Sequence, residues 1–300
     1  MISTASPQIR HAGTPRWVIP ALFTCYLVWG STYLAIRFAL VSFPPYFQMG
    51  SRFVVAGILL TGWMRWRGAA WPTRREWLNA AIVGTLMLAA AMGWLASAQQ
   101  HIGSGLIATF IATVPMVVTA VGLVAGKRPT RLEIVGMALG AVGVTMLVSG
   151  ASFSASPVGI TLMVSSVIAW SLGSVLQTGR LPLARGPMGF ASEMLCGGTV
   201  LMAISLLLGE QAMWPPQSAA VAAWAYLVVF GSLLAFSAYL YLLANASPAL
   251  ATSYAFVNPV IALALGVAFG SEVVSNGEWL ASAVILSGVI LIFLSKTKQT

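Results

Sequence analysis

Apolar residues run along this chain in ten stretches, each long enough to cross a lipid bilayer. A membrane helix needs about 20 mostly apolar residues to span about 30 Å of hydrocarbon. Short polar connections separate the stretches, which predict helices at 17–40, 45–66, 77–97, 103–125, 132–149, 158–179, 187–208, 219–243, 248–270 and 278–295. The expected fold class is therefore an all-α membrane protein with ten transmembrane helices.

Composition supports a chain that lives in a lipid bilayer. Hydrophobic residues make up 59% of it and charged residues only 7%, against about 25% charged residues in soluble domains. The net charge of +9 does not indicate nucleic-acid binding, because the basic residues sit in short connections rather than in a stripe. Cys25 and Cys196 both lie inside apolar stretches, so neither a disulfide framework nor a paired-cysteine metal site is expected.

The basic residues predict the orientation in the membrane. Lys and Arg concentrate in short cytoplasmic loops, and 13 of the 15 in this chain fall on one side of a ten-span arrangement. Both termini should therefore be cytoplasmic, in a multi-pass protein of a bacterial-type inner membrane. Residues 1–16 have no short apolar core followed by a small-residue cleavage site, so a removable signal peptide is not expected.

The two halves of the chain repeat weakly. Trp29 and Ser51 recur 141 positions later as Trp170 and Ser192, and Pro115 recurs 144 positions later as Pro259. Because each half holds five spans, the second half enters the membrane from the opposite side, which gives two inverted five-helix repeats. The expected organisation is a tail at 1–16, repeats at 17–149 and 158–295, a linker at 150–157 and a second tail at 296–300.

Several motifs resemble a known family of transporters. The motifs are WGSTY at 29–33, ATVP at 112–115, SPALATSY at 247–254 and VNP at 257–259. They are similar to the EamA branch of the drug/metabolite transporter superfamily, and within it to the YedA-like exporters. The resemblance implies a ten-helix bundle that exports amino acids, related metabolites or drugs through a central cavity. The chain departs from the family pattern at Gln99 and Gln100, where an acidic residue is expected.

The absence of aspartate argues against an enzyme. The 300 residues contain no Asp, and the six Glu and two His are scattered. Catalytic triads with Asp, phospho-aspartate pumps and Asp-based magnesium sites are thereby excluded. We expect no catalytic residues, no cofactor and no metal site.

Aromatic stripes suggest a substrate cavity near the midplane. Trp29, Tyr33 and Arg37 are four residues apart and share one helical face, and Trp170 opens an analogous stripe in the second half. The alternatives are that the aromatic residues only pack, and that Arg37 extends to the outer headgroups. The residues expected around the cavity are Trp29, Tyr33, Arg52, Trp94, Trp170, Tyr254 and Asn258.

Arg52 and Glu193 are charges inside apolar stretches, and they correspond under the 141-residue offset. Such charges normally face the bundle interior or water. Each lies about 10 Å deep, from opposite faces of a core about 30 Å thick, so about 10 Å should separate them along the membrane normal. We therefore expect Arg52 to contact substrate in the outer half and Glu193 to be a candidate for ion coupling in the inner half. Local hydrogen bonding that neutralises each charge is the alternative.

Pro115 and Pro259 lie near the middle of the fourth and ninth stretches. Each removes one helix hydrogen bond, so a kink is expected at both positions, either as fixed shape or as a hinge.

These features favour a secondary transporter of small amphipathic metabolites that works by alternating access, and the resemblance implies that it exports them. A passive facilitator or pore is one alternative, and a membrane-embedded enzyme acting on lipid is a weaker one. Glycine-rich faces, such as Gly136, Gly140 and Gly143, can pack within one chain or between two, so a homodimer stays open.

Overall fold

The computed structural model describes residues 16–124, 130–149, 156–246 and 253–297, and these residues form helices and no strands. The first half comprises α1 (Val18–Thr24), η1 (Cys25–Trp29), α2 (Gly30–Ala39), α3 (Pro45–Trp66), α4 (Arg74–Gly84), η2 (Thr85–Met92), α5 (Gly93–Ala98), α6 (Ser104–Ile111), α7 (Val114–Val124) and α8 (Arg131–Val148). The second half comprises α10 (Pro157–Thr178), α11 (Pro187–Leu207), α12 (Ser218–Tyr226), η3 (Leu227–Leu234), α13 (Ala235–Asn245), α15 (Tyr254–Phe269) and α16 (Asn276–Thr297). The segments η1, η2 and η3 are π-helical and continue directly from their α-helical neighbours.

Every one of the ten predicted stretches contains helix, with ends that differ by a few residues. Six helical stretches of the described residues are long and apolar enough to cross a membrane: Val18–Ala39, Arg74–Ala98, Ser104–Val121, Pro157–Thr178, Pro187–Leu207 and Ser218–Leu242. Tyr254–Phe269 and Asn276–Ile292 are shorter apolar helices. Residues 1–15 of the predicted tail, 150–155 of the predicted linker and 248–252 of the ninth stretch lie outside the described residues.

The two prolines act differently. The expected kink at Pro115 is instead a break, because α6 ends at Ile111 and α7 begins at Val114. The Thr113 hydroxyl donates to the Phe110 carbonyl at 2.7 Å, which satisfies an acceptor at the helix end. Pro259 lies inside α15, which continues through it.

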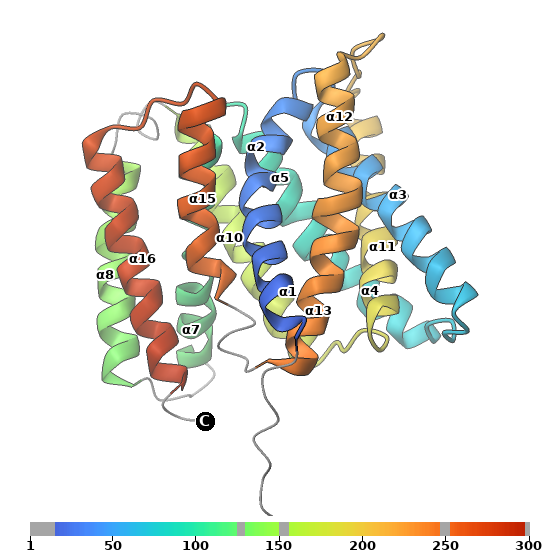
Figure 1. The fold of residues 1–300 in the computed structure, drawn as a ribbon, viewed down its shortest axis with the longest axis horizontal. Coiled ribbons are helices and arrows are strands. Elements are labelled where there is room, and N and C mark those ends of the chain that lie inside the picture. Colours follow the sequence, from blue (N-terminus) through green and yellow to red (C-terminus); the bar gives the residue numbers. More distant parts are fainter. Residues whose placement is uncertain (1–15, 125–129, 150–155, 247–252, 298–300) are drawn as a thin grey trace, which may run out of the picture.

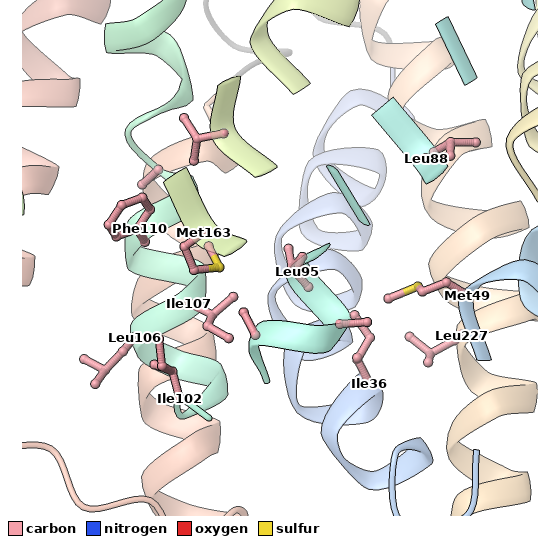
Figure 2. Packing of buried hydrophobic residues seen from close by; sticks show 14 of the residues in the cluster. Ile36, Met49, Leu88, Leu95, Ile102, Leu106, Ile107, Phe110, Met163 and Leu227 are labelled. Atoms are coloured by element: carbon pink, nitrogen blue, oxygen red, sulfur yellow. The ribbon is translucent and has the colours of Figure 1, made fainter. Parts of the chain in front are cut away.

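Close helix crossings hold the bundle together. Figure 1 shows α8 and α16 side by side at one end of the molecule, with α3 at the other end. At the α8–α16 crossing, a Cβ added to Gly136 would lie 2.6 Å from the Gly288 carbonyl oxygen, and the reverse holds for Gly288. Between these ends, Met49 of α3, Leu227 of η3 and Ile107 of α6 belong to one buried apolar cluster, part of which appears in Figure 2.

Three glutamates stabilise the start of their own helices. Glu76 and Glu133 complete capping boxes with Thr73 and Thr130, in which each side chain bonds to the other residue's backbone N–H. Glu278 does the same with Ser275. A carboxylate here accepts from backbone N–H groups that have no partner within the helix, and it also complements the helix dipole.

Two further glutamates reach the N-termini of helices far away in sequence. The Glu210 carboxylate accepts from the backbone N–H groups of Tyr46 and Phe47, at 3.2 and 2.8 Å, at the start of α3. Glu272, between α15 and α16, accepts from the N–H of Ser104 at 2.7 Å and from the N–H of Gly105 at 3.1 Å, at the start of α6. Both contacts join the first half of the chain to the second.

Arg37 adds an ion pair to the Glu272 site. Its guanidinium donates to the carboxylate of Glu272, in the one salt bridge found among the described residues. The Arg37 side chain is still 37% exposed, so its contact with the outer headgroups stays a prediction.

Protonation of Glu272 should weaken the fold. Burial by itself raises the pKa of this carboxyl, but hydrogen bonds from Ser104, Gly105 and Arg37 outweigh it and hold the pKa below its usual value. The stabilisation is therefore complete above about pH 4.3, the ordinary pKa of Glu, and is lost as pH falls through the lower pKa of the folded state. In detergent at pH 7, Glu272→Gln should lower the free energy of unfolding by about 2 kcal/mol. When both proteins are moved from pH 7 to pH 3.5, the free energy of unfolding should fall less for Glu272→Gln than for the parent.

Glu76→Gln is the matched control, because Glu76 is only half-buried and caps only its own helix. Its thermal unfolding at pH 7 should change less than that of Glu272→Gln. Equal acid sensitivity of the parent and Glu272→Gln would contradict the assigned role of Glu272.

The tight α8–α16 crossing predicts that Gly→Ala changes the stability differently at two positions. Gly136→Ala forces a Cβ against a backbone oxygen at 2.6 Å and should destabilise by about 1–3 kcal/mol. Gly62→Ala on α3 meets nothing within 4 Å and should be neutral or stabilising, since Ala favours helix by about 0.5–1 kcal/mol. Thermal unfolding in detergent measures both. If the two variants shift the midpoint equally, the crossing is not as close as described.

Candidate functional site

Two side chains of the first half hold adjacent residues of η3 in the second half. The indole N–H of Trp29 donates to the Gly231 carbonyl at 3.2 Å. The Arg52 Nε donates to the Ser232 hydroxyl at 2.9 Å. A Cβ on Gly231 would lie 3.0 Å from Arg52 Nη2, so the absence of a side chain there makes room for the guanidinium. We call Trp29, Arg52, Gly231 and Ser232 the hub.

Polar contacts extend the hub along the same helix. Trp224 Nε1 donates to the Ser51 hydroxyl at 3.0 Å, and the hydroxyls of Ser31 and Tyr226 are 2.6 Å apart. The continuous helix formed by α12, η3 and α13 is thus tied to α2 and α3 by side chains rather than by apolar packing alone. The π-helical turns in its middle are the kind of irregularity that is frequent at functional sites.

Aromatic rings surround Trp29. The ring centroids of Tyr254, Tyr239 and Phe236 lie 4.7, 5.4 and 5.4 Å from that of Trp29. Phe190 continues the group at 4.8 Å from Phe236. These edge and tilted geometries are the favourable ones for ring pairs. We call Trp29, Phe190, Phe236, Tyr239 and Tyr254 the aromatic cluster.

Part of the expected site is brought together here. Trp29 and Tyr254 touch, and Asn258 lies one turn beyond Tyr254 with 6% of its surface exposed. With its amide oriented to donate, the Asn258 nitrogen lies 3.3 Å from the Tyr254 carbonyl and 3.2 Å from that of Tyr26. The amide thus links η1 to α15.

The other predicted aromatic residues have different contacts. Tyr33 packs against the main apolar core. Trp94 on α5 and Trp170 on α10 are half-buried, and in the described part of the chain no ring contact joins them to the aromatic cluster. Their place at a shared central space stays a prediction. The sequence analysis missed Phe190, Phe236 and Tyr239, which carry no motif and come from helices of the second half.

Glu193 is buried in α11, and no described residue forms an ion pair with it. Only 2% of its surface is exposed, and its Oε2 has no hydrogen-bond partner among the described residues. The packing of α11 on α3 sets its depth, because Gly50 lies against Met202 and Gly57 against Leu195. In this antiparallel register Glu193 lies level with residue 59, seven residues from Arg52.

Seven residues of helix correspond to about 10 Å, so Arg52 and Glu193 occupy different levels of the bundle. No salt bridge joins these two residues in the structure, in agreement with the separation expected from the sequence.

The described residues contain no group of three or more His, Cys, Asp or Glu side chains that would suit a metal ion. A hollow of about 170 Å³ lies beside the Arg37–Glu272 pair and is lined by Arg37, Gly103, Leu106, Ser271, Glu272, Val273 and Val274. This hollow does not reach the aromatic cluster.

Comparison with known proteins identifies a transporter family and related sequences. The model of the EamA-like transporter family matches residues 16–149 and again 157–294. The chain is 44% identical to the "Uncharacterized inner membrane transporter YedA" of Escherichia coli K12, over 92% of this chain and 90% of the relative. It is 24% identical to "Protein PecM" of Dickeya dadantii, over 88% of each chain.

A solved crystal structure shares the fold, with a TM-score of 0.65 and 18% identity over 93% of this chain and 98% of that one. The two family matches cover nearly the whole sequence. The chain therefore belongs to the EamA-like transporter family and is a multi-pass membrane protein similar to YedA.

Proposed function

We propose that this protein is a secondary transporter that exports small amphipathic metabolites, such as amino acids, related compounds or drugs. The observation that carries the proposal is the hub, where a buried cation and an indole from the first half meet an irregular helix of the second half. Polar groups at such depth in lipid normally mark a substrate pathway, and the aromatic cluster offers apolar surface beside them.

The proposed architecture is two inverted five-helix units, 17–149 and 158–295, with both termini in the cytoplasm of an inner membrane. Transporters built in this way hold substrate near the midplane between the units. Alternating access would then rock one unit against the other, with the break at Pro115 and the proline at 259 as hinges. The family model's two matches support the duplication.

A passive facilitator or pore is the second candidate, favoured by Gln99 standing where an acid was expected. Gln99 is buried, and neither of its amide atoms has a partner among the described residues. A lipid-acting enzyme is less well supported, because the hydroxyls that donate to glutamates, such as Ser104 to Glu272, lie at helix N-termini that those glutamates cap. A homodimer remains a proposal.

Reconstitution into liposomes with a panel of labelled metabolites tests the function directly. Saturable flux is expected for at least one small amphipathic compound. Flux that rises linearly with concentration would instead indicate a pore, and chemical conversion of a compound would indicate an enzyme.

Loss of the aromatic cluster should impair transport without unfolding the protein. Trp29→Ala and Tyr254→Ala should each reduce the initial rate at least tenfold, because both remove ring surface at the same place. Trp66→Ala is the control, since Trp66 is 77% exposed and touches none of these residues. Normal transport by both cluster variants would assign the rings to packing alone.

Glu193 is the proposed site of coupling to protons. In liposomes with an imposed pH gradient, Glu193→Gln should lose gradient-driven accumulation while keeping substrate exchange, because an amide cannot bind and release a proton as the carboxyl can. Glu76→Gln, at an exposed helix start, should behave as the parent. Unchanged accumulation by Glu193→Gln would refute coupling through this residue.

A further inference from the structure

All the acidic side chains of this chain can be accounted for. The chain has six Glu and no Asp, and all six Glu lie in the described residues. The carboxylates of five accept hydrogen bonds from backbone N–H groups at helix N-termini: Glu76, Glu133, Glu210, Glu272 and Glu278. The sixth, Glu193, lies about 10 Å from Arg52 along the bundle at 1.5 Å per residue. In this structure, Arg52 is therefore not neutralised by any carboxylate side chain.

The surroundings of Arg52 leave most of its donors free of oxygen acceptors. The residue is 3% exposed. Its Nε donates to Ser232, while Nη1 has only the sulfur of Met49, at 3.9 Å. The Phe53 ring lies 5.0 Å from the guanidinium carbon. A guanidinium carries five N–H donors, so a buried cation here retains the capacity to bind an anion.

Gln48 lies one helical turn before Arg52 on α3. It is fully buried, and neither its amide nitrogen nor its amide oxygen has a hydrogen-bond partner among the described residues. Residues four apart share a helix face, with their Cβ atoms about 5–6 Å apart. An unsatisfied buried amide is costly, and its position beside an unpaired cation indicates that both side chains serve a ligand.

We propose that Arg52 and Gln48 bind the carboxylate of a monoanionic substrate, whose apolar body rests on the aromatic cluster. The proposal rests on the transport function and names the chemical class of its substrate. Arg52 supplies one positive charge and a planar pair of N–H donors that matches a carboxylate, and the Gln48 amide adds a further donor. Trp29 and Arg52 bond to the adjacent residues Gly231 and Ser232, so one small molecule can reach both.

Three labelled probes with the same aromatic ring test the charge preference. They are N-acetylphenylalanine, which is a monoanion, its neutral amide, and cationic phenylalaninamide. Uptake is measured in proteoliposomes clamped at zero membrane potential, since the probes would otherwise respond to the potential in opposite directions. The parent should transport the anion at least tenfold faster than either other probe.

Substitutions then assign the preference to residues. Arg52→Gln should reduce transport of the anion at least a hundredfold, and at least tenfold more than it reduces transport of the neutral amide, while Arg52→Lys should restore part of the anion transport. Gln48→Leu should raise the KM for the anion about tenfold, the loss expected for one hydrogen bond to a charged group. The controls are Arg67→Gln and Gln100→Leu, at exposed positions.

Binding in detergent separates this inference from the proposed function. N-acetylphenylalanine should raise the unfolding temperature of the parent but not of Arg52→Gln. Saturable transport without preference for the anion, unchanged in Arg52→Gln, would overturn the inference and leave the transporter standing. If no probe crosses the membrane, stabilisation that depends on Arg52 still supports anion binding, and its absence overturns it.

Discussion

Hydrocarbon provides no hydrogen-bond partner, so each polar group inside this bundle must be satisfied by the chain itself or by something the chain binds. The placement of the acidic residues follows from this constraint. Three glutamates cap the helices on which they lie, and Glu210 and Glu272 cap helices of the other half. Because five of the six carboxylates cap helices, the buried cation Arg52 and the buried carboxyl Glu193 are each left without an oppositely charged partner among the described residues.

The same constraint ties the two halves together at their centre. Trp29 and Arg52 each bond to η3, where π-helical turns alter the regular positions of the backbone groups. Ser51 and Ser31 bond to Trp224 and Tyr226 of the same continuous helix. In the proposed alternating access, motion of one half against the other would rearrange these contacts, and a ligand held at the hub would then act on the packing of the halves.

Periodicity and length predicted the helices well, because a membrane span needs a fixed number of apolar residues. The capping boxes were also readable, since Thr73-x-x-Glu76 and Thr130-x-x-Glu133 carry the local signature. Glu210 and Glu272 could not be assigned in this way, because their partners lie 163 and 168 positions away. The sequence predicted a kink at Pro115, but not that the Thr113 hydroxyl would bond to the Phe110 carbonyl at a break in the helix. Gln48 could not be assigned to the site from the sequence, because its relevance follows from the lack of a carboxylate beside Arg52 in the structure.

A structure with a bound, heavy-atom-labelled anion tests the central claim, that the uncompensated Arg52 holds the substrate's charge. N-acetyl-4-bromophenylalanine retains the ring and the carboxylate, and its bromine can be located by anomalous scattering. The account predicts the bromine in the aromatic cluster, with the carboxylate oxygens about 2.7–3.2 Å from the Arg52 guanidinium and the Gln48 amide nitrogen. A ligand bound elsewhere, with Arg52 paired instead to Glu193, would contradict it.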